Sequence, residues 1–147
     1  MQKQSSSRIN FFFLARNISF RRRGKLKDFM AFLIRQEGRS IDMINCIFCS
    51  DKYLLEMNRK HLKHDYYTDI ITFDLSDSSG KISAEIYISI DRVRENAMTS
   101  QTTIAHELYR VIFHGLLHLC GYNDKKKDEI SEMRSREDYY LSAYGKF

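Results

Sequence analysis

Proline and tryptophan are both absent from this sequence of 147 residues, and it shows no internal repeat, low-complexity tract or linker. No apolar run approaches the roughly 20 residues that a membrane-spanning helix needs. The apolar stretch from Phe11 to Ala15 is too short for a signal-peptide core and lacks a cleavage pattern of small residues. These absences predict a single domain over residues 1–147, in the cytoplasm and without a membrane partner. The polar residues 1–7 are expected to be frayed.

Cysteine is scarce, with three residues in the chain, and a small odd number is typical of reduced thiols in a cytosolic protein. Cys46 and Cys49 form a C-x-x-C, a spacing that also occurs in redox and zinc sites. They lie in IDMINCIFCS, which has the pattern of a strand, and residues three apart on a strand point to opposite faces. Because no second pair completes a zinc site, we interpret both as small packing residues.

Charge is abundant, and its positive part is clustered. Hydrophobic residues make up 43% and charged residues 29%, as in ordinary globular proteins, and the net charge is +5. Single basic runs are usually solvated faces. Three clusters together favour a polyanionic partner, since phosphate contacts dominate nucleic-acid affinity. The clusters are Arg21, Arg22, Arg23, Lys25 and Lys27; Arg59, Lys60 and Lys63; and Lys125, Lys126 and Lys127.

Apolar periodicity divides the chain into four strands and five helices, which predicts one α/β domain with a mixed sheet of about four strands and about five helices. The segment 77–80, DSSG, supplies turn chemistry for an antiparallel hairpin. The strand after it alternates, so that Glu85 is expected on a polar face that could form the wall of a cleft. Expected strands span 9–14, 41–49, 70–75 and 82–90, and expected helices span 25–37, 91–98 and about 128–144. Two further helices are expected: one that Ser50 or Asp51 can cap and that carries Leu54, Met57 and Leu62, and a long one that Thr103 can cap and that bears the histidines as far as Leu119.

The segment FHGLLHLCGYND, from Phe113 to Asp124, has the pattern of a metal site on a helix. His114 and His118 are four residues apart, which places them on one helical face about 5–6 Å from each other. Two imidazoles at that separation can bind one ion at about 2.0–2.1 Å. Gly121 permits a turn that returns Asp124 as a third ligand, as in extended zinc helices.

Two histidines at this spacing are weak support by themselves, because buried histidines are usually hydrogen-bonded core residues. Here the neighbouring Phe, Leu and Cys side chains offer few partners, and a shared metal resolves that conflict. His106 lies about 12 Å away along the helix and cannot join the same ion. Asp128 is a rival third ligand, but its spacing is wrong, so we choose Asp124.

A zinc ion with three protein ligands keeps a position for water and lowers the pKa of that water towards about 7, which is typical of hydrolytic enzymes. In zinc peptidases with the H-E-x-x-H motif, the residue after the first histidine is the glutamate base. Here that residue is Gly115, so peptide hydrolysis loses its base.

The motif HGLLHLCGY, together with TDIITF at 68–73 and AEIYIS at 84–89, resembles the YbeY family of bacterial metal-dependent endoribonucleases. The resemblance implies a single-strand-specific RNA nuclease that matures the 3′ end of 16S ribosomal RNA and acts in ribosome quality control. It also implies one zinc ion in a cleft between a helix and the sheet. Its partners would be ribosomal RNA and the small ribosomal subunit. His114 and His118 match the first two ligands of the family.

The sequence departs from the family pattern at two places. Asp124 stands where the family has its third histidine; a carboxylate is a legitimate zinc ligand but adds negative charge. Leu62 stands where the family has an arginine that contacts RNA phosphate. The nearby Arg59, Lys60 and Lys63 are therefore the candidate RNA-binding residues. No general acid is identified beyond the candidate Glu85.

Three hypotheses follow from these residues. The first is a zinc-dependent endoribonuclease. The second is a ribosome-associated RNA-binding factor with a mainly structural zinc and little or no cleavage, which the missing arginine keeps open. The third is a metalloprotease, against which Gly115 argues.

Overall fold

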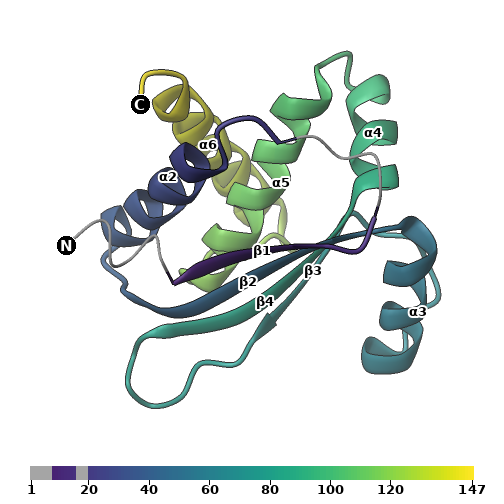
Figure 1. The fold of residues 1–147 in the computed structure, drawn as a ribbon, viewed down its shortest axis with the longest axis horizontal. Helices are drawn as coiled ribbons and strands as arrows, with labels where there is room; N and C mark the ends of the chain where they lie inside the picture. The colour runs from purple at the N-terminus through teal and green to yellow at the C-terminus, as the bar shows by residue number, and fades with distance from the viewer. Residues whose placement is uncertain (1–7, 16–19) are drawn as a thin grey trace.

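The computed structural model of the protein describes residues 8–15 and 20–147, so the segment 1–7, for which fraying was expected, lies outside it. Within the described residues the chain forms the expected four strands and five helices, and their ends differ from expectation by at most two residues (Figure 1). None of these helices is long and apolar enough to cross a membrane. The elements are β1 (Ile9–Phe13), α2 (Arg23–Gln36), β2 (Ile41–Cys49), α3 (Asp51–Leu62), β3 (Ile70–Asp74), β4 (Ile82–Ser89), α4 (Ile90–Thr99), α5 (Ile104–Leu119) and α6 (Lys127–Gly145).

The four strands form one mixed sheet in the order β1-β2-β4-β3, which confirms the predicted fold class. β1, β2 and β4 run parallel, whereas β3 pairs antiparallel with β4. The predicted hairpin turn is present, and Gly80 adopts a positive φ of 84° there, a conformation that glycine reaches without a steric penalty. β3 is therefore an edge strand, and the hairpin joins it to the central strand β4.

Helices cover the sheet unequally. α2, α5 and α6 lie over one face, and α3 lies on the other (Figure 1). The two cysteines of β2 confirm the strand interpretation, because Cys46 is buried in the large core under α2 and α5 while Cys49 is buried in a small cluster with Leu54 of α3. Burial raises the pKa of each of these thiols to about 12, so neither is a reactive thiolate.

Helix α5 is central to this arrangement, since it contacts α2, α4, α6, β3 and β4. Its N-terminus is capped as predicted, with the Thr103 hydroxyl accepting a hydrogen bond from the backbone N–H of His106 at 3.0 Å. Its apolar stripe enters the large core through Leu108, Val111, Ile112, Leu116 and Leu119. The opposite stripe is thereby left for polar side chains.

Gly115 lies where α5 crosses the β3–β4 hairpin. A Cβ atom at this position would be 2.7 Å from Cδ1 of Ile70, 3.4 Å from Oγ1 of Thr72 and 3.6 Å from Cγ2 of Ile86. The missing side chain thus lets the helix that bears the histidines approach the sheet closely.

We predict that Gly115→Leu lowers the free energy of unfolding by about 1–3 kcal/mol, because the added side chain overpacks this contact. Gly115→Ala should be much milder, since the Ile70 methyl can rotate away and alanine favours the helix. Gly24→Leu is the control: it is also a helical glycine, but a Cβ there has no neighbour within 4 Å among the described residues. Urea unfolding of the three variants measures the difference, and equal stability of both leucine variants would contradict the packing role.

Candidate metal centre

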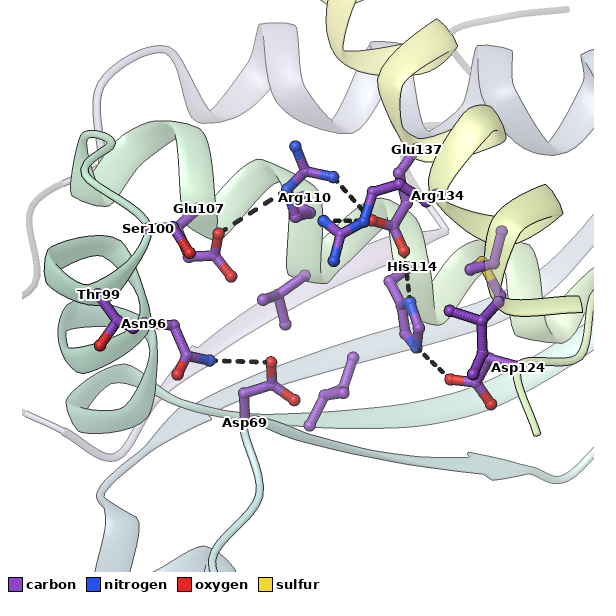
Figure 2. Close-up of a pocket in the computed structure, with 14 residues that line it drawn as sticks. Asp69, Asn96, Thr99, Ser100, Glu107, Arg110, His114, Asp124, Arg134 and Glu137 are labelled. Carbon is purple, nitrogen blue, oxygen red and sulfur yellow. Dashed lines mark hydrogen bonds and ion pairs between the residues drawn. The ribbon is translucent and has the colours of Figure 1, made fainter. Parts of the chain in front are cut away.

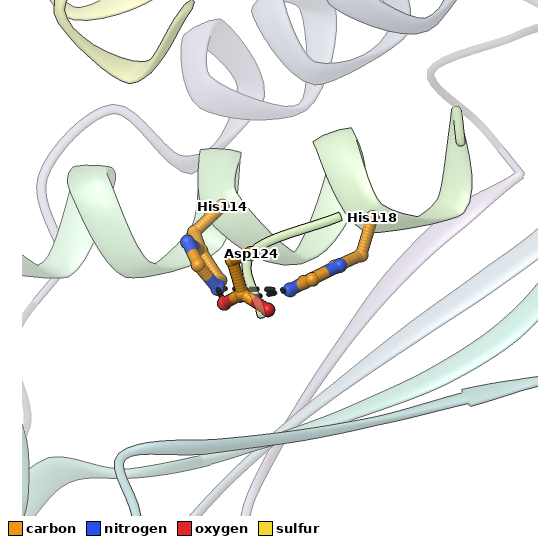
Figure 3. Close-up of side chains that lie close together, drawn as sticks. All are labelled: His114, His118 and Asp124. Carbon is orange, nitrogen blue, oxygen red and sulfur yellow. Dashed lines mark hydrogen bonds and ion pairs between the residues drawn. The ribbon is translucent and has the colours of Figure 1, made fainter. Parts of the chain in front are cut away.

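Three side chains converge at the C-terminal end of α5. The Nε2 atoms of His114 and His118 are 3.0 Å apart, and each lies 3.2 Å from Oδ2 of Asp124 (Figure 3). All three side chains are partly exposed. They form the group of potential metal ligands found within the described residues.

The loop after α5 brings Asp124 back to the helix. Gly121 has a φ of 107°, which allows the chain to reverse, and the N–H of Tyr122 donates to the carbonyl of Leu117 at 3.1 Å. The Tyr122 hydroxyl donates to Glu37 at 2.9 Å, which fixes the loop against the end of α2. The glycine turn expected from the sequence is therefore present.

Hydrogen bonds at Nδ1 set the orientation of both imidazoles. A carbonyl oxygen can only accept, so the Nδ1 of His118, 2.9 Å from the carbonyl of Tyr122, must carry a proton. The Nδ1 of His114 lies 2.6 Å from Oε2 of Glu137 and donates to that carboxylate. The expectation that these histidines have few partners is thus wrong at Nδ1, because α6 and the loop supply them.

The Nε2 atoms carry the case for a metal. With Nδ1 protonated in each neutral imidazole, both Nε2 lone pairs point towards each other and towards the carboxylate of Asp124. Three lone pairs so close repel one another unless a proton or a metal ion lies between them. Ligands about 2.0–2.1 Å from a tetrahedral zinc ion are about 3.3 Å apart, close to the separations found here. The donor set therefore fits a zinc-sized ion.

Glu137 of α6 is the principal support of this group. Its carboxylate is buried and accepts from Nη1 of Arg110 at 2.9 Å as well as from His114 (Figure 2). Burial would raise the pKa of Glu137, but the hydrogen bonds from His114 and Arg110 outweigh it and lower that pKa. Burial would likewise lower the pKa of His114, but Glu137 outweighs it and raises that pKa. The surroundings thus favour positive charge at this histidine.

Two cavities meet at the three ligands. One, of about 520 Å³, lies between α4, α5 and α6 and is lined by Asp69, Arg110 and Arg134 as well as His114 and Asp124 (Figure 2). The other, of about 630 Å³, extends past His118 towards the end of α3 and Lys125. Because both share His114 and Asp124, the ligands lie in the middle of a groove rather than at its end.

The comparisons with known proteins show the family of the chain. The family model for Endoribonuclease YbeY matches residues 15–145, which is most of the chain. The chain belongs to the YbeY endoribonuclease family. The Endoribonuclease YbeY of Cytophaga hutchinsonii is 50% identical over 134 residues, 91% of this chain and 94% of its own, and that of Amoebophilus asiaticus is 41% identical over 138 residues, 92% and 94% respectively. The solution structure of TM1509 from Thermotoga maritima matches with a TM-score of 0.64 and 26% identity, covering 92% of this chain and 88% of that one.

The candidate RNA-binding residues around Leu62 are not brought to the groove. Leu62 itself, which the resemblance matches to an arginine, lines the second cavity. Arg59 is exposed and forms an ion pair with Asp65, and Lys60 and Lys63 are exposed. None of these three cations, all within the described residues, lines either cavity.

The structure also separates Glu85 from the ligands. Glu85 accepts a hydrogen bond from the Tyr87 hydroxyl at 3.1 Å, and the Tyr87 ring stacks with Tyr53 of α3. Side chains alternate along β4, so Glu85 lies on the α3 face while His114 lies on the opposite one. Glu85 is therefore not placed to act as a general acid at the candidate ligands. His106, as expected, is exposed and apart from the ligands.

Other residues of the site were missed by the sequence reasoning. Glu137 and Arg134 come from α6, and Asp69 comes from the turn before β3, where Asn96 donates to it at 3.3 Å. Burial raises the pKa of Asp69. Glu107 and Arg110 of α5 were also missed, although the sequence holds a signal for them. Together with His114 and His118 they recur at spacings of three and four residues, which is a polar stripe on an otherwise apolar helix.

We predict that Asp124→Ala lowers the affinity for zinc more than about tenfold, because it removes one of three ligands. Asp128→Ala is the matched control, since Asp128 is exposed in the first turn of α6 and outside the ligand group. Asp124→His should retain the metal. Elemental analysis after gel filtration gives the occupancy, and a metal loss in Asp128→Ala instead would move the third ligand.

We also predict that Glu137→Gln weakens zinc binding about 10- to 100-fold, because the amide no longer holds the His114 Nδ1–H with a full negative charge. Asp138→Asn is the control: Asp138 also pairs with Arg110, at 3.2 Å, but is exposed and does not contact His114. Competition with a zinc-binding dye measures both affinities. Equal affinities in the two variants would show that Glu137 does not support the ligand.

Proposed function

We propose that the protein is a zinc-dependent, single-strand-specific endoribonuclease that acts in the cytoplasm on the 3′ end of 16S ribosomal RNA and in ribosome quality control. The observation that carries the proposal is the convergence of His114, His118 and Asp124 on one point in a groove that continues in both directions. A strand that passes through such a groove presents an internal phosphodiester to the ligands. The relatives that cover most of the chain are named endoribonucleases.

The residues of the site have different roles in this proposal. His114, His118 and Asp124 would hold the zinc ion, and Glu137 and the Tyr122 carbonyl keep the two imidazoles turned towards it. A zinc ion with three protein ligands supplies an activated water and withdraws charge from a phosphate oxygen. Asp124 adds a negative charge that a third histidine would not, so cations in the groove wall matter more for a phosphate here. The ribosomal substrate is inferred from the family.

The two alternatives differ in their support. An RNA-binding factor with a structural zinc is favoured by Leu62, because its side chain cannot bind a phosphate. A metalloprotease is disfavoured by the packing of Gly115, since a glutamate there would meet Ile70 and Ile86 of the sheet rather than the ligands. The nuclease remains the function that the groove and the ligands support best.

We predict that the purified protein cleaves single-stranded RNA and that a chelator abolishes cleavage, with recovery on addition of zinc. His114→Ala should reduce the rate at least 100-fold, because two ligands do not keep the ion. His106→Ala is the matched control, an exposed histidine on the same helix. End-labelled RNA with a 16S 3′-end sequence, run beside its duplex and the equivalent DNA, measures activity and specificity.

The outcomes separate the three hypotheses. Cleavage that survives His114→Ala unchanged would exclude the metal-dependent nuclease. Tight RNA binding without cleavage by zinc-loaded protein would support the RNA-binding factor. Casein hydrolysis that His114→Ala abolishes would support the metalloprotease.

A further inference from the structure

The missing family arginine leaves one wall of the groove without a guanidinium. The end of α3 offers Leu62 there, and Arg59 is turned to Asp65. The rest of the groove near the ligands is rich in acid, with Asp69, Glu107 and Glu137 lining the first cavity. An RNA phosphate at the metal centre therefore needs a cation from elsewhere in the wall.

Arg134 is placed to supply that cation. It lies on α6, one turn before Glu137, and its side chain reaches over the first cavity, which His114 and Asp124 also line (Figure 2). Its side chain is 60% exposed, and its ion pair, from Nη1 to Oε1 of Glu137, is long at 3.4 Å. The guanidinium has five N–H donors, and four of them take no part in this ion pair. They therefore remain available to bind a ligand.

Arg110, the other arginine of the cavity, is held by ion pairs within the protein. Its side chain is 18% exposed and forms ion pairs with Glu107, Glu137 and Asp138. Glu137 in turn receives its close contacts from Arg110 and His114, at 2.9 and 2.6 Å, so it does not depend on Arg134. Arg110 thus stabilises the ligand support, and Arg134 is the guanidinium that can turn to a substrate.

We propose that Arg134 binds the RNA phosphate next to the metal centre, replacing from α6 the arginine that Leu62 replaces at the end of α3. The proposal rests on the proposed function, because it assigns a residue to that substrate. A guanidinium binds a phosphate with two parallel N–H···O bonds, whereas a lysine offers a single point charge. A guanidinium in the first cavity instead of the second preserves the charge and the fork while it changes the side from which they approach the ligands.

The test compares Arg134→Ala, Arg134→Lys and wild type in cleavage of single-stranded RNA, with zinc content measured on each sample. Arg134→Ala should lower kcat/KM about 10- to 100-fold, as expected for the loss of one hydrogen-bonded contact to a charged group, while zinc content stays unchanged. Arg134→Lys should fall between the two. Arg35→Ala is the control, since it removes the same charge from an exposed site on α2 outside both cavities.

A swap tests the equivalence of the two positions. Leu62→Arg should restore most of the activity lost in Arg134→Ala, because it returns a guanidinium to the groove from the α3 side. A failure to restore activity would overturn the claim that Arg134 takes the place of an arginine at position 62. Wild-type kcat/KM in Arg134→Ala, or a loss of activity that only follows a loss of zinc, would overturn the phosphate contact itself.

A binding measurement keeps this proposal separate from the nuclease. The slope of log K against log salt for a single-stranded RNA should be smaller by about 0.7 in Arg134→Ala, the change expected for one lost phosphate contact. If the wild-type protein binds but does not cleave RNA, the proposed function fails while this slope still decides the role of Arg134. An unchanged slope would overturn the phosphate contact of Arg134.

Discussion

The 3.0 Å separation of two imidazole Nε2 atoms is the contact around which the site is built. Helical spacing alone places His114 and His118 on one face of α5, but it leaves their rings free to rotate. The rings face each other because Glu137 and the Tyr122 carbonyl accept from the two Nδ1 atoms. Two aligned lone pairs are unfavourable without a cation. Hydrogen bonds at one nitrogen of each ring thus leave the other nitrogen in a position to bind a metal.

These hydrogen bonds depend in turn on how α6 and the loop are attached. Glu37, just after α2, accepts from Tyr122 of the loop and from Arg136 and Tyr140 of α6. Burial would raise the pKa of Glu37, but these hydrogen bonds outweigh it and lower that pKa, so the residue stays a carboxylate. One carboxylate at the end of α2 therefore fixes both segments that orient the histidines.

The fold and the convergence of the three candidate ligands could be predicted because each rests on local periodicity. Alternation along β4 and the apolar stripe of α5 place these elements without knowledge of their neighbours, and the spacing of His114, His118 and Asp124 is set by one helix and one turn. Glu137 could not be found in this way, since it lies 23 residues from His114 and approaches only when α6 packs on α5. Glu85 was misplaced for a related reason: alternation gives two faces, but not which one the histidine helix covers.

Asp124 and Leu62 both affect the charge that faces a phosphate. With Asp124 as third ligand, the candidate ligand set is more negative by one charge than three neutral histidines would be, and Leu62 brings no positive charge to the second cavity. Arg134 supplies one positive charge from α6, and Lys125, beside Asp124 in the second cavity, supplies another. Phosphate binding depends on the summed field of the groove, not on the helix that carries each charge. Cations on α6 and in the loop beside Asp124 can therefore contribute to this field although α3 places Leu62 there.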